Sequence, residues 1–178
     1  MDELYILRHG IAAEHGTPGI PDDERPLTPE GRRRMRQIAR GLRRLDLRPD
    51  RIVTSPLPRA SATAEIVAGV LEPEQGLETA DVLRAGSDAR AIRDWLRQRT
   101  EGRLMIVGHD PGLTDLIALL VVGDGEGDGL RPRVCELKKG GIAALRPSDA
   151  SAGRFELVWV ATPRLIRRLA GIGNRSRK

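Results

Sequence analysis

Leu4-Tyr5-Ile6-Leu7-Arg8-His9-Gly10, near the start of this 178-residue chain, is the stretch that most strongly predicts its fold. Four apolar residues in succession are typical of a strand. Arg8 and His9 follow this strand, and Gly10 favours a turn behind them. Ligands of α/β proteins bind at the carboxyl ends of parallel strands. We therefore expect Arg8 and His9 to lie at a functional edge of the sheet.

Two later segments repeat this pattern of a strand followed by polar side chains. Ile52-Val53-Thr54 predicts a short strand that leads into Ser55 and Arg59, and Leu104-Met105-Ile106-Val107 predicts a buried strand that leads into Gly108-His109. Two of the three histidines of the chain thus follow strong strands. We expect these side chains to meet those of the first strand at one edge of the sheet.

Helical patterns alternate with these strands. We expect a first helix that is capped by Thr28, begins at Pro29 and stops near Asp46 to Pro49, and further helices over 59–71, 88–99 and 113–121. We also expect a late hairpin formed by Val134–Leu137 and Ile142–Leu145, a strand over 154–160, a short last helix from Thr162-Pro163, and loops over 11–27, 72–88 and 123–129. The alternation predicts an α/β fold, a three-layer sandwich with a mainly parallel central sheet, helices on both faces and the late β-hairpin.

Length and composition predict one domain over 1–170 with a basic, flexible tail over 171–178. No apolar stretch approaches the length of a membrane span, and no signal peptide is evident, so we expect a soluble cytoplasmic protein with no membrane partner. The single cysteine, Cys135, has no partner for an internal disulfide and is expected to be packed in a strand.

The net charge is +5, and only three of the 30 basic residues are lysines. Nine arginines fall within residues 32–51, where Met35, Ile38 and Leu42 recur at helical spacing, so most of these arginines are expected on a solvated helix face. The segment 164–178 holds six basic residues and no acid. No aromatic residue is interleaved with a basic run, and nucleic acid is therefore not the expected partner.

Two arginines and two imidazoles around one point make a binding site for a tetrahedral dianion, because each guanidinium offers a planar fork of donors. A metal site is disfavoured, since arginine repels cations and no third histidine or carboxylate has ligand spacing. A serine hydrolase elbow and a Gly-x-x-x-x-Gly-Lys phosphate loop are both missing from the sequence. The residues thus predict phosphate chemistry without a metal or another cofactor.

The chain resembles the histidine phosphatase superfamily, which is also called phosphoglycerate-mutase-like. The resemblance rests on Leu7–Gly10, Thr54–Ala60 and Val107–His109, and the stretches Asp23–Gly31 and Gly108–Leu113 are similar to the SixA-type phosphohistidine phosphatase branch. These matches cover about residues 3–122, and the remainder is similar only in length and strand order.

The resemblance implies that His9 is the nucleophile of a phosphatase that forms a phosphohistidine intermediate. Arg8 and Arg59 would hold the nonbridging oxygens, and His109 would donate a further hydrogen bond. Gly10 and Ser55 join them as expected substrate-binding residues. The expected substrate is phosphohistidine in a protein, and the alternatives are small phosphomonoesters or, in another class, a noncatalytic module that binds phosphate or nucleic acid.

The general acid is less well defined by the sequence. In larger relatives a carboxylate after the second helix protonates the leaving group, and we favour Asp81, with Glu78, Glu14 and Asp23 as alternatives. Asp110 follows the second expected catalytic histidine, where the small branch often has Asn, and it is expected to cap the next helix. His15 matches no motif and is expected to be a solvated loop residue.

Overall fold

The computed structural model describes residues 1–123, 134–149 and 153–171. A six-stranded sheet in the order β3-β2-β4-β1-β5-β6 forms its centre. The strands are β1 Glu3–Arg8, β2 Arg51–Thr54, β3 Leu77–Thr79, β4 Arg103–Gly108, β5 Ile142–Asp149 and β6 Arg154–Ala161. The first four are parallel, whereas β5 runs antiparallel to both β1 and β6.

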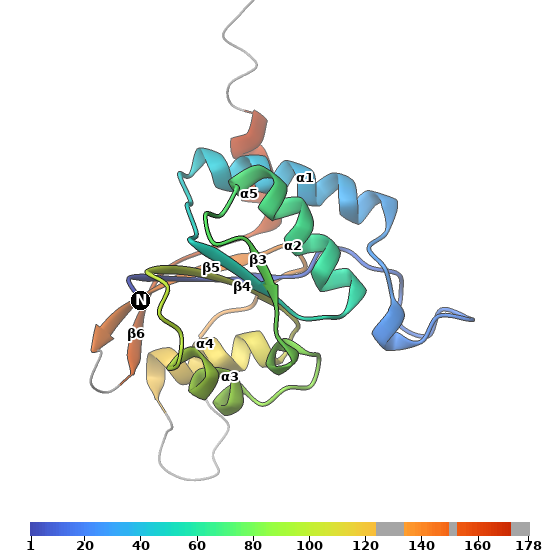
Figure 1. Ribbon diagram of the computed structural model, residues 1–178. Helices are drawn as coiled ribbons and strands as arrows, with labels where there is room; N and C mark the ends of the chain where they lie inside the picture. Colours follow the sequence, from blue (N-terminus) through green and yellow to red (C-terminus); the bar gives the residue numbers. More distant parts are fainter. Residues whose placement is uncertain (124–133, 150–152, 172–178) are drawn as a thin grey trace, which may run out of the picture.

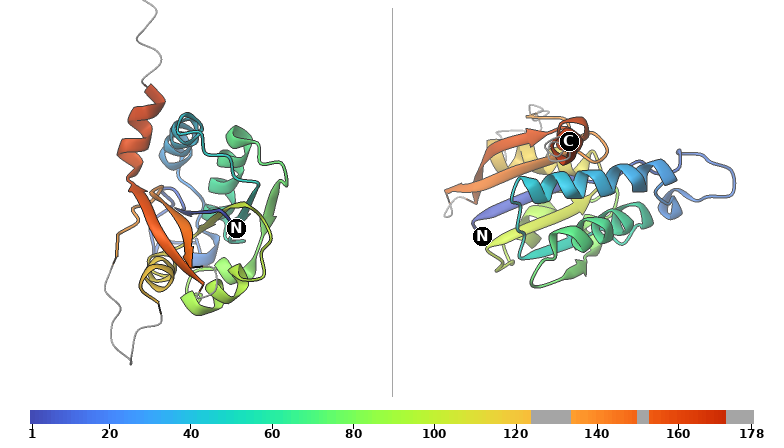
Figure 2. Two further views of the ribbon diagram at one scale, coloured as in Figure 1. Left: turned by 90° about the vertical axis from the view of Figure 1, so that its left-hand side faces the viewer. Right: turned by 90° about the horizontal axis from the view of Figure 1, so that it is seen from above.

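Helices cover both faces of this sheet, as predicted (Figure 1). Those described are α1 Pro29–Arg44, α2 Pro58–Leu71, α3 Ala89–Leu96, α4 Gly112–Val122 and α5 Pro163–Gly171. Helices α1, α2 and α5 lie over one face, and α3 and α4 lie over the other (Figures 1 and 2). The three-layer α/β sandwich expected from the sequence is therefore confirmed.

The first strand contributes to both cores because successive side chains of a strand point to opposite faces. Tyr5 and Leu7 pack under α1 and α2, while Leu4 and Ile6 pack against α3 and α4. All four side chains are buried, and burial of each large aliphatic side chain stabilises the fold by roughly 1.5–3 kcal/mol. This is why the continuous apolar run of β1 lies near the middle of the sheet.

The structure has a late hairpin, but the predicted pairing of Val134–Leu137 with Ile142–Leu145 is wrong. β5 and β6 form it, and residues 134–137 are not a strand. Leu137 instead buries its side chain in the core below the sheet, and the turn at Gly140-Gly141 bonds to the end of β1: the amide of Gly140 donates to the carbonyls of Arg8 and His9. The backbone at Gly140 is thus hydrogen-bonded to the end of β1 and does not extend β5.

Two smaller differences concern other segments. Residues 72–88, predicted to be a loop, include the short strand β3 and a 3-10 helix, Asp81–Leu83. β3 has three residues, too few to show a strand period. Cys135 lies outside any strand and packs half-buried against the core on the α3 and α4 side. The expected loop 123–129 and tail 171–178 fall almost entirely outside the described residues. No helix in the described part of the chain is long and apolar enough to cross a membrane.

Candidate active site

His9 lies directly after β1 and is 5% exposed. Its Nδ1 is 2.7 Å from the carbonyl oxygen of Gly10. Because a carbonyl only accepts, Nδ1 carries the proton of neutral His9, and Nε2 carries the lone pair. Burial lowers the pKa of His9 to about 4, with further contributions from the positive charges of Arg59 and Arg8. His9 is therefore neutral at physiological pH, with an available Nε2.

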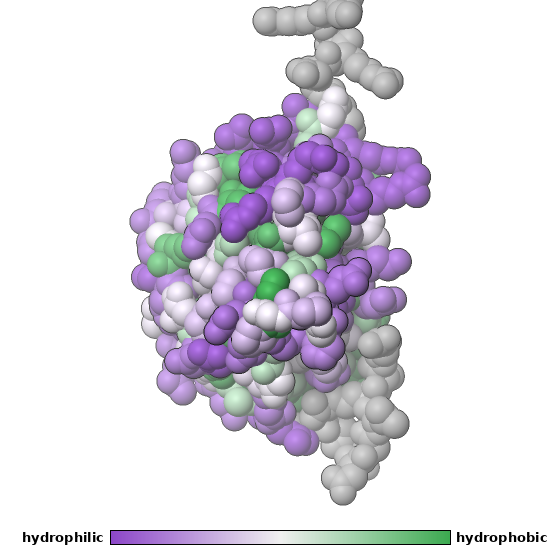
Figure 3. Space-filling view, turned by 90° about the vertical axis from the view of Figure 1, so that its right-hand side faces the viewer, coloured by the Kyte–Doolittle hydropathy of each residue, from purple (hydrophilic) through white to green (hydrophobic). Residues whose placement is uncertain are grey.

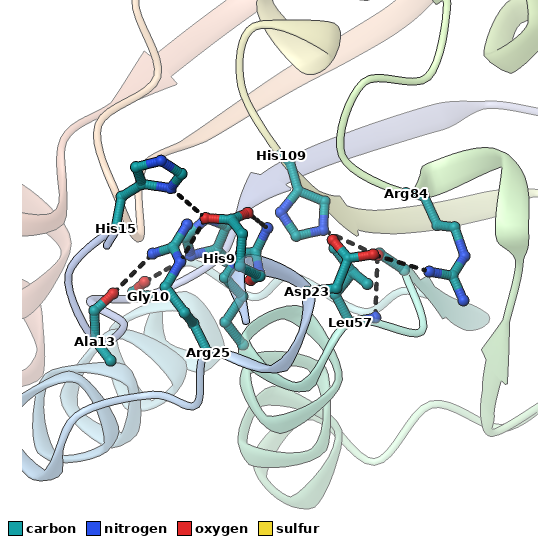
Figure 4. A network of polar contacts seen from close by, with 12 residues as sticks. His9, Gly10, Ala13, His15, Asp23, Arg25, Leu57, Arg84 and His109 are labelled. Carbon is teal, nitrogen blue, oxygen red and sulfur yellow. Dashed lines mark hydrogen bonds and ion pairs between the residues drawn. The ribbon is translucent and has the colours of Figure 1, made fainter. Parts of the chain in front are cut away.

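His109 follows β4, and the two imidazole ring centroids are 5.1 Å apart. Nε2 of His109 lies 2.9 Å from Oγ of Ser55, which follows β2, and Oγ also accepts from the amide of Leu57 at 3.2 Å. Burial, followed by the charges of His9 and Arg59, lowers the pKa of His109 to about 3. Three parallel strands thus bring together His9, Ser55 and His109, as the sequence predicted. His9 and His109 are labelled in Figure 4.

Arg59 lies in the first turn of α2 and is 2% exposed. Its Nη1 donates to the backbone carbonyl of Asp22 at 2.7 Å, and Nη2 lies 3.5 Å from the Asp22 carboxylate. Thr63, one turn later, accepts from the amide of Gly10 at 3.0 Å and donates to the carbonyl of Arg59. This hydroxyl fixes α2 against the turn that carries His9.

Arg8 is held from two sides. Its Nη1 donates to the carbonyl of Leu137 at 2.6 Å and to the carboxylate of Asp110 at 3.1 Å. The other oxygen of Asp110 accepts from the hydroxyl of Thr114 at 2.7 Å. The prediction that Asp110 caps α4 is therefore wrong: the residue before this helix is Pro111, and no side chain caps it. The β1–β4 pairing places Asp110 beside a guanidinium, which offers a carboxylate a stronger, charge-assisted bond.

Three nitrogens of this site are buried without a hydrogen-bond partner: Arg8 Nε, Arg59 Nε and His109 Nδ1. Among the described residues, four buried side-chain polar atoms lack a partner, so three of those four lie here. Buried polar groups are normally satisfied, and such a concentration indicates a ligand site. The described residues contain no group of three or more His, Cys, Asp and Glu arranged to hold a metal ion. The arrangement suits an oxyanion.

The carboxylates proposed as general acid lie farther out. Asp81 is 86% exposed and accepts from Arg84 at 2.9 Å. Asp23, which is 67% exposed, lies 3.7 Å from the same Arg84 and points toward it in Figure 4. Glu78 accepts both hydrogen bonds of a bidentate pair with Arg99, which hold its pKa below the ordinary value. Glu14 lies exposed in the first loop.

Sequence reasoning missed a second layer around Arg59. The Asp22 carboxylate accepts from Nδ1 of His15 at 2.6 Å and from Arg25 at 2.8 Å, and these bonds lower its pKa to about 2. Arg25 also donates to the carbonyl of Ala13, which closes the first loop on itself (Figure 4). His15 is exposed, as expected, but it is not solitary. The signal for this layer in the sequence was the run Asp22-Asp23-Glu24-Arg25. Acidic residues beside a phosphate site are expected to pair with basic ones, and here Asp22 pairs with Arg25.

An α/β sandwich with two buried imidazoles and two arginines at the ends of parallel strands defines a class of phosphoryl-transfer enzymes. A family model described as histidine phosphatase superfamily (branch 1) matches residues 4–84. The chain is 30% identical over 125 residues to the phosphohistidine phosphatase SixA of Escherichia coli K12, covering 68% of this chain and 76% of that protein. The chain belongs to the histidine phosphatase superfamily, and it is a SixA-like phosphatase.

Further proteins are similar to this chain in sequence or in fold. An uncharacterized protein of Picosynechococcus is 36% identical over 152 residues, which cover 83% of this chain and 87% of that protein. The solved structure of the protein histidine phosphatase SixA complexed with tungstate has a TM-score of 0.76 at 25% identity, covering 92% of this chain and 99% of that one. A mycobacterial glucosyl-3-phosphoglycerate phosphatase shares the fold, with a TM-score of 0.64 at 19% identity, over 89% and 99% of the two chains.

Proposed function

We propose that this phosphatase removes phosphate from phosphohistidine in proteins and that His9 is its nucleophile. The observation that carries the proposal is the state of His9: a buried imidazole whose Nδ1 is bound to the carbonyl of Gly10 and whose pKa is about 4. Such a ring presents an unprotonated Nε2 at neutral pH without a general base to activate it. A nucleophile of this kind divides one difficult transfer into two easier ones.

In the first step His9 Nε2 attacks phosphorus in line, a nitrogen–phosphorus bond forms, and the bond to the leaving nitrogen of the substrate breaks. The leaving nitrogen takes up a proton. In the second step a water oxygen attacks the phosphohistidine, so that the bond to His9 breaks and inorganic phosphate leaves. Arg8 and Arg59 hold the nonbridging oxygens throughout. His109, oriented through Nε2 by Ser55, donates from Nδ1, its nitrogen without a partner.

The choice of a phosphohistidine substrate rests on the relation to SixA and on the exposed carboxylates. A phosphorylated imidazole loses a better leaving group than an alkoxide and needs less help from an acid. Asp81, paired with Arg84 and mostly exposed, is the proton donor that we propose. The oxyanion tungstate bound to the solved SixA is consistent with a pocket built for a tetrahedral anion.

The function is tested by measuring phosphate release with a chelator present, from a phosphohistidine protein, a sugar phosphate and a nucleotide. We expect the highest kcat/KM on the phosphohistidine protein and none in His9→Ala. Brief exposure to labelled substrate should leave an acid-labile, alkali-stable label on His9. The control variant His15→Ala, which lacks a histidine outside the pocket, should carry the same label. A higher kcat/KM on a small phosphomonoester would identify the enzyme as a small-molecule phosphatase. Label on a serine would exclude His9 as the nucleophile, and binding without turnover would exclude catalysis.

A further inference from the structure

A groove with a volume of about 620 Å³ runs between α1 and α5, and none of its lining residues belongs to the active site described above. We call it the arginine groove; its principal lining residues are Arg34, Gln37, Arg40, Arg164, Arg167 and Arg168. The helices meet closely because Gly41 has no side chain: a Cβ there would lie 2.2 Å from the carbonyl oxygen of Ile166. Close contact of the two backbones leaves the long side chains on either side to form the walls.

The charge of these two helices is strongly one-sided. Together α1 and α5 hold ten arginines and one acidic residue, Glu30. The whole chain has a net charge of only +5, so the remaining residues are net negative. Hydrophilic residues cover the upper part of the face in Figure 3, over these helices. A concentrated positive field of this kind attracts and orients negatively charged partners.

Helix stability accounts for only part of this charge: Arg33 and Arg34 pair with Glu30, and Arg43 and Arg44 lie in the last turn of α1, where the helix dipole favours cations. Arg32, Arg33 and Arg34 lie in the first turns of α1, the end at which the helix dipole disfavours cations. The side chains of Arg40, Arg164 and Arg168 are exposed and make no hydrogen bond or ion pair within the described residues. The groove therefore presents several guanidinium groups whose donors are available to a ligand.

The remaining lining side chains are already oriented. Nε of Arg167 donates to Oε1 of Gln37 at 2.7 Å, across the groove from α5 to α1. Nε of Arg34 donates to Glu30 at 2.5 Å. Both bonds leave the terminal nitrogens of these guanidinium groups free to form paired hydrogen bonds with a carboxylate. Arginine, unlike lysine, matches a carboxylate in this bidentate way.

We propose that the arginine groove is a docking surface for an acidic segment of a protein partner. A groove between two helices admits a single extended polypeptide, whereas a membrane surface is flat and duplex nucleic acid is wider than one extended chain. Single-stranded nucleic acid is bound through stacked aromatic side chains, and none lines this groove.

Gly140 connects the two helices of the groove with the active site. A Cβ on Gly140 would lie 2.8 Å from Ile38 of α1 and 3.7 Å from Pro163 of α5, and the Gly140 amide donates to the carbonyls of Arg8 and His9. A phosphorylated protein at the active site could therefore place an acidic segment in the groove. Only this last step, the identity of the partner as the substrate, rests on the proposed function.

Binding is measured with the full chain by fluorescence anisotropy of a labelled peptide of alternating glutamate and glycine. We expect saturable binding that weakens with added salt and that is at least about ten-fold weaker in Arg40→Gln/Arg168→Gln. Arg48→Gln/Arg97→Gln, which removes the same charge elsewhere on the surface, should bind within about two-fold of wild type. Turnover of a small phosphomonoester should not differ between the two double variants.

The proposal is overturned if the groove variant binds the peptide as the wild type does, or if both double variants weaken binding equally. Tighter groove-dependent binding of single-stranded RNA or of anionic phospholipid vesicles would replace the acidic peptide with that partner. Peptide binding together with inactivity on a phosphohistidine protein would overturn the proposed substrate and leave the docking surface intact. Full activity on that protein without peptide binding would overturn the docking surface and leave the proposed substrate intact.

Discussion

The imidazole rings of His9 and His109 lie 5.1 Å apart, centroid to centroid, at an interplanar angle of 50°. Two imidazolium ions at this distance would repel each other in a buried site, next to two guanidinium groups. Burial is the main reason that both rings are neutral, and nearby positive charges add to it, so that the pKa is about 4 for His9 and about 3 for His109. The pocket derives its permanent positive charge from Arg8 and Arg59, and one histidine is available as a nucleophile.

This relationship predicts a stability that depends on pH. The unfolded histidines have a pKa near 6.5, so below that pH His9 and His109 are protonated in the unfolded chain but remain neutral in the folded chain. The free energy of unfolding should thus fall as pH decreases from about 6.5 towards 4, by at most about 3 kcal/mol for His9. Urea unfolding at several pH values measures it. His9→Gln should make this dependence less steep, leaving the contribution of His109, and exposed His15→Gln should not change it. An equal effect of both variants would contradict the assignment.

Ser55 should position His109. Removing the hydroxyl in Ser55→Ala leaves Nε2 of His109 and the amide of Leu57 without their partner, and we expect kcat/KM to fall about ten-fold and the protein to lose about 1–2 kcal/mol of stability. Ser61→Ala, on the exposed side of α2, removes only a hydroxyl bond to Glu65. Steady-state kinetics and urea unfolding compare the two. Equal behaviour would mean that Ser55 has no positioning role.

Asp110 should position Arg8 and also reduce the charge of the pocket. Asp110→Asn keeps an acceptor for Arg8 but removes the negative charge, so KM for a phosphate dianion should decrease a few-fold while kcat changes little. Asp110→Ala removes the contact altogether, so Arg8 is less well oriented and kcat should fall about ten-fold. Identical kinetic constants for the two variants would show that Asp110 acts only through its charge or not at all.

The proposed acid role of Asp81 should depend on the leaving group. Asp81→Asn should lower kcat by about 100-fold on an alkyl phosphate, whose alkoxide needs a proton, and by much less on phosphohistidine. Asp23→Asn, which removes the other carboxylate beside Arg84, is the matched control. If Asp23→Asn shows the larger loss, Asp23 is the donor. If neither variant distinguishes the two substrates, protonation comes from water.

Much of the fold was predictable because it depends on local patterns. The burial of β1 and β4 can be predicted from their apolar runs, and the buried face of α1 can be predicted from the spacing of its apolar residues. β3 and residues 134–137 were not predictable: three residues show no period, and the route of 134–137 depends on hydrogen bonds between Gly140 and the distant end of β1. Backbone donors satisfied by remote partners leave no local signature.

The sequence by itself determined the residue types of the phosphate pocket, since Arg8, His9, Ser55, Arg59 and His109 each follow a strand end that is visible in the apolar pattern. Only the tertiary structure decided how they act together. The contact of Asp110 with Arg8, the bonds of Asp22 to Arg59 and the gathering of arginines from α1 and α5 into one groove all join residues distant in the chain. Burial and charge act through distance in space, and folding sets that distance.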